Sequence, residues 1–325
     1  MLANLARRAI TGLAVVAGVV SLTFLLLQLA PGDAVEHLLG PTATTAQLAA
    51  QRRALGLDRP LVAQYVAWLA RFARGDWGTS VATGRPVRAL LGEAWPATVR
   101  LVGLSLLLSY LLGVAAGALQ AAWARSRLDT AISVASVTLY ALPGYWLALM
   151  LITTFTYWAR ALPAFGAAGV DAELLTGWAR VADAGRHLAL PLATLTLVGV
   201  GGVARFVRSA MLDVATQPFV TTARAKGLAP RMVWLHHVLR NALIPVLTLL
   251  GLSLPALFSG AVFVEAVFAW PGIGTLLVEG VRARDYPVVM AATSVSAVLV
   301  VLGNLLADTL AAWADPRLQT GSRTA

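Results

Sequence analysis

The polar residues that could act on another molecule gather between Arg205 and Arg240. This stretch holds six basic residues and one acidic residue, a net charge of +5, and includes Lys226, the only lysine of the chain. Its centre combines hydroxyl, small and basic side chains in the order Thr221, Thr222, Ala223, Arg224, Ala225, Lys226 and Gly227. None of these residues is paired with a base that could activate it as a nucleophile. The residue types therefore indicate binding to another molecule.

Groups that usually carry out catalysis are missing or poorly placed. The chain has no cysteine, which excludes a thiolate nucleophile and a cysteine metal site. No Gly-x-x-x-x-Gly-Lys-Ser/Thr sequence is present, so we expect no ATP hydrolysis by this chain. His236 and His237 are adjacent and would diverge on a helix, so they predict no metal site. Ser259-Gly260 lacks the leading glycine of the Gly-x-Ser-Gly motif of intramembrane proteases.

The stretch from Arg205 to Arg240 is predicted to contain two short helices. Pro218 can open the first helix, and Gly227 stands where a left-handed residue would end it. Pro230 can open the second helix, and the small side chains of Ala223 and Ala225 would let another protein approach the first one closely. A basic loop that only holds anionic lipid is the alternative, which explains the charge but not the order of helix, glycine and helix.

The composition predicts a polytopic membrane protein. Of the 325 residues, 58% are hydrophobic and only 12% are charged, yet the net charge is +10. A soluble protein carries about 25% charged residues, and a disordered chain would be far less apolar. Nucleic acid is not expected as a partner, because the basic residues form no concentrated stripe on a soluble fold.

Six charge-free runs are long enough to cross a bilayer, which needs about 17–25 residues. A charge at mid-membrane costs at least about 2.5–3.5 kcal/mol, so such runs are informative. They predict an all-α fold with six transmembrane helices at Ala9–Gly32, Leu101–Ala124, Thr130–Ala159, Leu188–Ala204, Asn241–Val264 and Tyr286–Ala307. The first run is too long for a signal peptide and no cleavage site follows it, so we expect it to be retained.

The charges of the connecting segments predict the orientation. The N-terminus, the loop at 125–129, the stretch at 205–240 and the C-terminal tail carry +8 together, and the other three connections carry +2. Positive charge is retained on the cytoplasmic side of membranes. Both termini are therefore expected in the cytoplasm.

Four regions are predicted along the chain. They are a first transmembrane helix at 1–30, an external insertion at 31–96, a membrane core with helices 2–6 at 97–314, and a cytoplasmic tail at 315–325. The insertion has helical character, and its apolar stripe consists of Leu61, Tyr65, Trp68, Leu69 and Phe72. The stripe could pack on the membrane domain or contact an external partner.

Prolines interrupt two of the predicted spans. Pro143 lies near the middle of the third span, and Pro245 and Pro255 lie in the fifth. A proline frees a backbone carbonyl, which a membrane tolerates where another helix or a water-filled cavity satisfies it. These prolines indicate either simple packing kinks or helices that bend around a translocation path.

The segment from 265 to 287 is too apolar for a free loop. Pro271-Gly272 is expected to turn the chain into a short helix, and Phe268 and Trp270 are residue types found at membrane interfaces. The segment should lie at the external mouth of the domain. The segment could anchor the chain at the membrane interface or line a gate. The candidate gate residues are Trp270, Pro271, Gly272 and Gly274.

Several motifs resemble the inner-membrane permeases of ABC importers, specifically the first permease subunit of the dipeptide, oligopeptide and nickel group. Thr222-Ala223-Arg224-Ala225-Lys226-Gly227 matches the peptide-group version of the permease loop, although the glutamate and first alanine of the generic Glu-Ala-Ala loop are absent. Further matches, in chain order, are Leu55-Gly56-Leu57-Asp58, Arg74-Gly75-Asp76-Trp77-Gly78, Leu239-Arg240-Asn241-Ala242, Trp270-Pro271-Gly272-Ile273-Gly274, Arg284-Asp285-Tyr286-Pro287 and Asp315-Pro316-Arg317. The resemblance thus covers nearly the whole chain.

This resemblance implies an ATP-driven importer made of several subunits, in which this chain is not an enzyme. A second permease, two cytoplasmic ATPase subunits, an extracytoplasmic substrate-binding protein and membrane lipid are the implied partners. ATP and Mg²⁺ would be bound by the ATPase subunits, and no cofactor or metal by this chain. Thr221, Thr222, Ala223, Arg224, Lys226 and Gly227 would form the loop that couples ATPase movement to transport. Peptides or similar small solutes are the implied substrates.

A secondary transporter that needs no ATP is the alternative. Such proteins usually have ionisable residues at mid-membrane for ion coupling. The six charge-free runs contain none, and Asn304 and Asp308 lie near one end of the last run. Uptake that persists without ATP and collapses with the proton gradient would favour this alternative.

Overall fold

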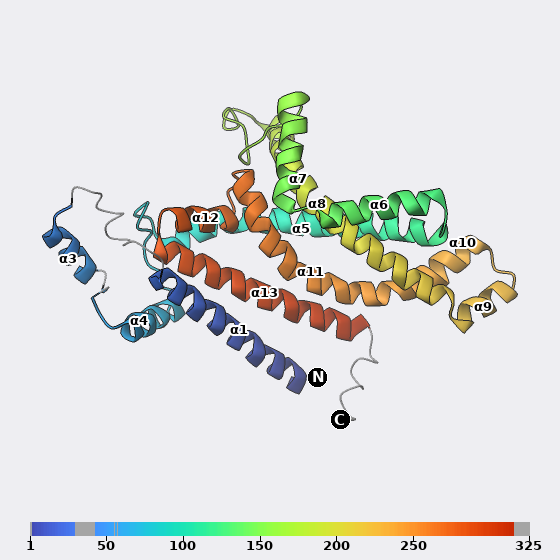
Figure 1. The fold of residues 1–325 in the computed structure, drawn as a ribbon, viewed down its shortest axis with the longest axis horizontal. Helices are drawn as coiled ribbons and strands as arrows, with labels where there is room; N and C mark the ends of the chain where they lie inside the picture. Colours follow the sequence, from blue (N-terminus) through green and yellow to red (C-terminus); the bar gives the residue numbers. More distant parts are fainter. Residues whose placement is uncertain (1, 30–42, 55, 57, 315–325) are drawn as a thin grey trace. The chain divides into compact units, whose positions relative to one another are not determined.

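The computed structural model describes residues 2–29, 43–54, 56 and 58–314. Within these ranges the chain is helical, as predicted, and the only pairing of extended backbone joins Thr79 to Pro86. Figure 1 shows the helices, which are α1 (Leu2–Leu29), α3 (Thr45–Ala54), α4 (Leu61–Ala73), α5 (Val87–Ala122), α6 (Arg127–Ala141), α7 (Gly144–Leu151), α8 (Gly177–Ala215), α9 (Pro218–Ala225), α10 (Pro230–Met232), α11 (Arg240–Val267), α12 (Ile273–Arg282) and α13 (Tyr286–Ala314). Two π-helical stretches, η1 (Ile152–Trp158) and η2 (Val233–Leu239), continue α7 and α10. The predicted tail at 315–325 and the start of the insertion at 31–42 lie outside the described residues.

Packing divides the chain into two compact units. Unit 1 comprises Met1–Ala6, Val99–Trp270 and Leu302–Ala325, and unit 2 comprises Arg7–Thr98 and Pro271–Val301. The helix α5 begins earlier than the span predicted from Leu101, because its first turns carry charged residues and extend beyond the apolar run. It therefore passes through residue 96, the predicted end of the external insertion.

Four described helices are long and apolar enough to cross a membrane, and a bent pair makes up to five. The four are the segments Arg7–Leu29, Val87–Ala122, Gly177–Ala215 and Tyr286–Leu306. The predicted fifth span lies within α11, in which Phe258–Val267 is a shorter apolar helix. The apolar composition and the several long helices are those of an integral membrane protein.

The bent pair corresponds to the predicted third span. The segments Arg127–Ala141 and Gly144–Trp158 meet at an angle of 105°. Leu142 and Pro143 both have extended backbone, which is the conformation favoured before a proline and incompatible with a continuing helix. In Figure 1, α7 consequently rises almost at right angles from α6. Pro143 therefore produces a sharp bend, whereas Pro245 and Pro255 lie inside the continuous helix α11.

Unit 1 is built around α8, which packs against α6, α7 and α11. Glycines bring α8 close to α5, since a Cβ atom at Gly117 would lie 2.5 Å from the carbonyl oxygen of Ala204. Gly113, one turn earlier on α5, faces the side chain of Val203 in the same way. Small residues four apart allow two membrane helices to approach closely. These glycines therefore fix the distance between α5 and α8.

Unit 2 joins α4, the segment at 74–86, α12 and the first turns of α13 around a buried cluster of Val87, Leu91, Ala94, Ile273, Val288, Ala291 and Ala292. The carboxylate of Asp285, at the start of α13, accepts hydrogen bonds from the Ser80 hydroxyl and the Ala82 amide. On α4, the Tyr65 hydroxyl lies 2.7 Å from that of Ser21 on α1. Part of the predicted apolar stripe thus packs on the chain itself, although Leu61 and Leu69 remain exposed.

Candidate functional site

The loop that follows α8, here named the α9 loop (residues 216–229), folds as the sequence predicts. Pro218 occupies the first position of α9, where its missing amide hydrogen costs nothing. Gly227 follows the helix with φ of +74°, a left-handed conformation that glycine adopts easily. The Gly227 amide donates to Arg224 O at 2.9 Å, and the Leu228 amide donates to Ala223 O at 3.4 Å. These two bonds form the Schellman motif, which ends α9 at a defined residue.

The inner face of α9 packs on the protein's own core. Val220 and Ala223 are buried in one cluster with Val207 and Met211 of α8 and Val233 and Val238 of η2. The small side chain of Ala223 therefore allows α9 to lie close to its own chain. Of the two small residues expected to leave room for another protein, Ala223 faces inward and Ala225 is exposed.

The outer face of α9 is exposed and basic. Thr221, Thr222, Arg224, Ala225 and Lys226 are all exposed, as is Phe219. The Thr222 hydroxyl donates to Pro218 O at 3.0 Å, which satisfies one carbonyl of the helix. This face presents hydroxyl groups, two cations and one aromatic ring on a helix whose other side is held in place. Such a surface can dock into a complementary cleft without refolding.

The second helix of this region runs without a break from Pro230 through η2 into α11. Its π-helical stretch contains His236 and His237, of which His236 is exposed and His237 partly buried. No group of three or more His, Cys, Asp or Glu residues is close enough to hold a metal ion in the part of the chain that the structure describes. The α9 loop is therefore connected directly to a long helix of unit 1.

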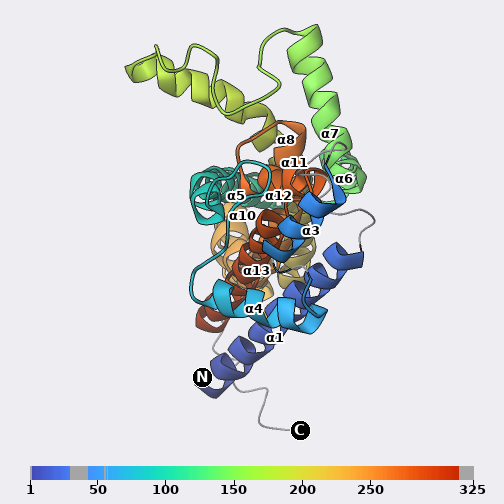
Figure 2. The same ribbon diagram turned by 90° about the vertical axis from the view of Figure 1, so that its left-hand side faces the viewer.

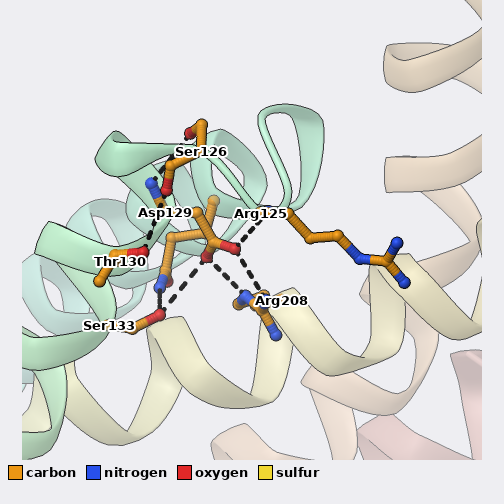
Figure 3. Close-up of polar contacts among 7 residues, drawn as sticks. Arg125, Ser126, Asp129, Thr130, Ser133 and Arg208 are labelled. Carbon is orange, nitrogen blue, oxygen red and sulfur yellow. Dashed lines mark hydrogen bonds and ion pairs between the residues drawn. The ribbon is translucent and has the colours of Figure 1, made fainter.

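An ion pair with a buried carboxylate joins α6 to α8 in the part of α8 that leads to the α9 loop (Figure 3). Arg208 of α8 donates to both carboxylate oxygens of Asp129, from Nε at 2.7 Å and from Nη2 at 2.8 Å. The Asp129 carboxylate also accepts the Arg125 amide at 2.9 Å, and its own amide is capped by the Ser126 hydroxyl. The loop between α5 and α6 is thereby tied to α8, two turns before α9 begins. A Ser-x-x-Asp capping signal is visible in the sequence, but the partner 79 residues away is not.

The second predicted site, here named the Trp270 turn (residues 268–274), is buried. Trp270 has an exposed fraction of 0% and Phe268 of 1%, so neither side chain faces lipid. Within unit 1, the guanidinium of Arg100 lies 5.2 Å from the Trp270 ring centroid, and Phe268 O accepts the Gly166 amide at 2.9 Å. Protein atoms cover both aromatic rings, which disfavours anchoring at the membrane interface, one of the two roles that the sequence leaves open.

The remaining residues of this turn belong to unit 2. Gly272 precedes the first turn of α12, so Pro271-Gly272 leads into a short helix as predicted. The Ile273 amide donates to the Thr98 hydroxyl at 2.8 Å, and Ile273 and Gly274 are buried. These residues hold the start of α12 in place, through the Ile273 amide and through the Ile273 side chain, which lies in the buried cluster of unit 2.

Comparisons with known proteins place this architecture in a family. Residues 1–102 match the model of the binding-protein-dependent transport system membrane component, N-terminal region, and residues 110–320 match that of the binding-protein-dependent transport system inner membrane component. The chain is 37% identical to the oligopeptide transport system permease protein AppB of Bacillus subtilis (strain 168), covering 98% of this chain and 100% of AppB. It is 40% identical to the probable D,D-dipeptide transport system permease protein DdpB of Escherichia coli (strain K12), over 94% of each chain. It is 36% identical to the glutathione transport system permease protein GsiC of Salmonella choleraesuis (strain SC-B67), over 92% of each.

Solved structures share the fold at low sequence identity. The membrane chain of the inward-facing MetNI methionine ABC transporter superposes with a TM-score of 0.58 at 18% identity, covering 71% of this chain and 98% of that one. An amino acid ABC transporter crystallised with histidines gives a TM-score of 0.52 at 14% identity, covering 71% and 94%. With the two family models matching nearly its whole length, the chain belongs to the binding-protein-dependent inner membrane components, which are the permease subunits of ABC importers.

Proposed function

We propose that this chain imports peptides or similar small solutes as one of two permeases in an ATP-driven complex. Its partners would be a second permease, two cytoplasmic ATPase subunits that bind ATP and Mg²⁺, and an extracytoplasmic substrate-binding protein. The names of AppB and DdpB, which state oligopeptide and dipeptide transport, support the substrate class.

We infer six transmembrane helices with both termini in the cytoplasm. The broken pair α6–α7 would form the third span and α11 the fifth. The distribution of +8 against +2 between the two sides supports this orientation. The regions 1–30, 31–96, 97–314 and 315–325 would then be the first helix, the external insertion, the permease core and the cytoplasmic tail.

The proposed coupling to an ATPase rests on one observation: one face of α9 is buried against the protein's own core, and the other face is exposed. Val220 and Ala223 attach the helix to its own core, and the exposed side presents Thr222, Arg224 and Lys226. An ATPase cleft that receives this exposed side would move α9 as a rigid body when the ATPase dimer closes around ATP. Because α9 is fixed to α8 and η2, that movement would be passed to α8 and α11. The pathway would thereby alternate between its two open states.

We also propose that Trp270, Pro271, Gly272 and Gly274 form the external gate. The support is that Trp270 is fully buried and that Gly272 begins a helix, so this turn has a defined backbone rather than a loose one. Its role would be to hold a fixed shape while the helices around the pathway move.

The test of coupling compares two alanines on opposite faces of α9. Ala225→Asp places a charge on the exposed face, where we expect normal folding and assembly but loss of ATP-dependent peptide uptake in proteoliposomes. Ala223→Asp places the same charge in the buried cluster, where we expect loss of folded permease before any effect on coupling. Arg224→Glu should lower uptake in the same way as Ala225→Asp. Normal uptake by a fully assembled Ala225→Asp complex would overturn the proposed docking face.

A further inference from the structure

A polar cavity of about 410 Å³ lies in unit 1, and neither the α9 loop nor the Trp270 turn contributes to it. Its lining comes from the end of η1, the segment that follows and the early turns of α8, and includes Thr156, Arg160, Leu162, Asp183, Arg186 and His187. Ligand pockets in proteins usually have volumes of about 300–1,000 Å³. The cavity is thus large enough for a small solute.

The helix α8 places this cavity at the opposite end of the unit from α9. His187 lines the cavity and Ala215 ends the helix, and at 1.5 Å per residue the two lie about 42 Å apart along α8. A bilayer with its headgroups is about 40–45 Å thick. The uncharged run from Leu188 to Ala204 lies between them. Figure 2 shows how the segment after η1 connects α7 to the start of α8 at this end. With the orientation and ATPase docking proposed above, the cavity would lie at the membrane face away from the ATPase.

The Asp183 carboxylate has partners within the protein. Its Oδ2 accepts the Gly169 amide at 2.8 Å, and its Oδ1 lies 3.4 Å from His187 Nδ1. The same His187 nitrogen is 2.9 Å from Asp183 O. The only carboxylate among the lining residues thus holds the loop around Gly169 and orients the imidazole.

The remaining polar groups of the cavity are donors without acceptors. Arg160 and Arg186 form no ion pair within the described ranges. The Thr156 hydroxyl oxygen is buried and has no hydrogen-bond partner among the residues that the structure describes. Two exposed arginine side chains and a buried hydroxyl therefore line the same cavity, and all three are donors to which a carboxylate or phosphate can bind.

The backbone of Arg160 has a left-handed conformation, as do those of Arg125, Ala269 and Arg284. Its φ is +50°, in the left-handed region that favours glycine, at the residue that follows the end of η1. A helix end of this kind is usually formed by glycine, since side chains with a Cβ are strained there. Strained residues that persist in a fold occur preferentially at functional sites.

We propose that the cavity binds the carboxylate of a short peptide at the external face of the permease. Arg160 and Arg186 would donate to the two carboxylate oxygens, and the Thr156 hydroxyl would supply a third donor. The choice of a peptide rests on the proposed function, because the phosphate of a lipid headgroup offers the same oxyanion chemistry. The inference places a substrate contact on the permease itself, in addition to those of the binding protein.

The experiment measures binding of radiolabelled dialanine to the membrane complex of the two permeases and two ATPase subunits, with no binding protein added, in phosphatidylcholine nanodiscs by scintillation proximity. We expect unlabelled dialanine to compete and its C-terminal amide to compete at least tenfold more weakly, since hydrogen bonds between charged groups are the strong ones. Arg186→Gln and Arg160→Gly should each weaken binding about tenfold or more. Arg160→Gly is informative because it removes the side chain while relaxing the backbone, so the variant should melt no lower than wild type. Arg180→Gln removes the same charge from an exposed position of α8 outside the cavity and should leave binding unchanged.

Equal competition by dialanine and its amide, or wild-type affinity in both cavity variants, would overturn the inference. Loss of dialanine binding when phosphatidylglycerol is added to the nanodiscs, together with equal competition by the amide, would assign the cavity to a lipid phosphate. ATP-dependent uptake of dialanine by wild-type proteoliposomes is measured in parallel. If uptake occurs and the binding result is negative, only the cavity assignment fails; absence of uptake of every tested peptide contradicts the proposed function instead.

Discussion

The α9 loop and the Trp270 turn both carry family motifs, yet the structure uses the two sets of residues differently. In the α9 loop, Ala223 is buried while Thr222 and Arg224 are exposed. In the Trp270 turn, the aromatic side chains of Phe268 and Trp270 are both buried. Motif residues in the first region are therefore divided between folding and docking. The aromatic motif residues of the Trp270 turn mainly stabilise the fold.

The largest expected effect tests whether the Trp270 turn mainly stabilises the fold, by removing its largest buried side chain. Trp270→Ala should destabilise the permease by about 3–5 kcal/mol, because it leaves a cavity that the surrounding residues cannot fill. We expect a marked loss of monodisperse protein in detergent extracts heated before size-exclusion chromatography. Trp158→Ala is the matched control, since Trp158 is 79% exposed at the end of η1 and its loss should have little effect on folding. Equal melting of the two variants would show that Trp270 is not a structural residue and would return it to a purely gating role.

The same contrast shows what could be predicted from the sequence and what could not. Local signals were sufficient for the start of α9 at Pro218 and for its end at Gly227, because proline and glycine restrict or permit particular backbone angles. They were not sufficient to tell which face of α9 is buried. Ala223 and Ala225 differ by two positions in an eight-residue helix, and only tertiary packing against α8 and η2 distinguishes them.

Long-range partners were also beyond the sequence. The pairing of Asp129 with Arg208 and that of Ser80 with Asp285 join residues far apart in the chain, and no periodicity relates them. The charge-free runs predicted the apolar segments, but Pro143 was compatible with either a slight kink or a sharp bend. The extended backbone of Leu142 and Pro143 decided in favour of the bend.

The Asp129–Arg208 pair tests whether the α9 loop needs a rigid support. The Asp129 side chain is 6% exposed and that of Arg208 is 32% exposed, so the two residues are not equivalent. Arg208→Gln leaves a buried carboxylate without its cation and should cost about 3 kcal/mol, whereas Asp129→Asn leaves a better solvated guanidinium and should cost about 1–2 kcal/mol.

These values are measured by thermal unfolding of the assembled complex, with the double variant completing the cycle. We expect the double variant to be more stable than the sum of the single effects, because the uncompensated charge is removed. Additive effects would mean that the two side chains do not interact in the assembled complex. Unchanged coupling in a folded Arg208→Gln complex would show that docking of α9 does not depend on this support.

The smallest expected effect concerns Gly227, which tests whether the end of α9 is set by backbone conformation or by space. A Cβ atom at this position would meet nothing within 4 Å, so any cost of Gly227→Ala comes from its φ of +74°. We expect a loss of about 1–2 kcal/mol of stability from strain in the left-handed region. Gly185→Ala is the control, because its Cβ would also meet nothing but its backbone is helical, and it should stabilise by about 0.5–1 kcal/mol. Opposite signs in thermal unfolding would show that the backbone of Gly227 holds the Schellman motif. The same sign for both variants would mean that the inner face of α9, rather than its final turn, determines where the helix lies.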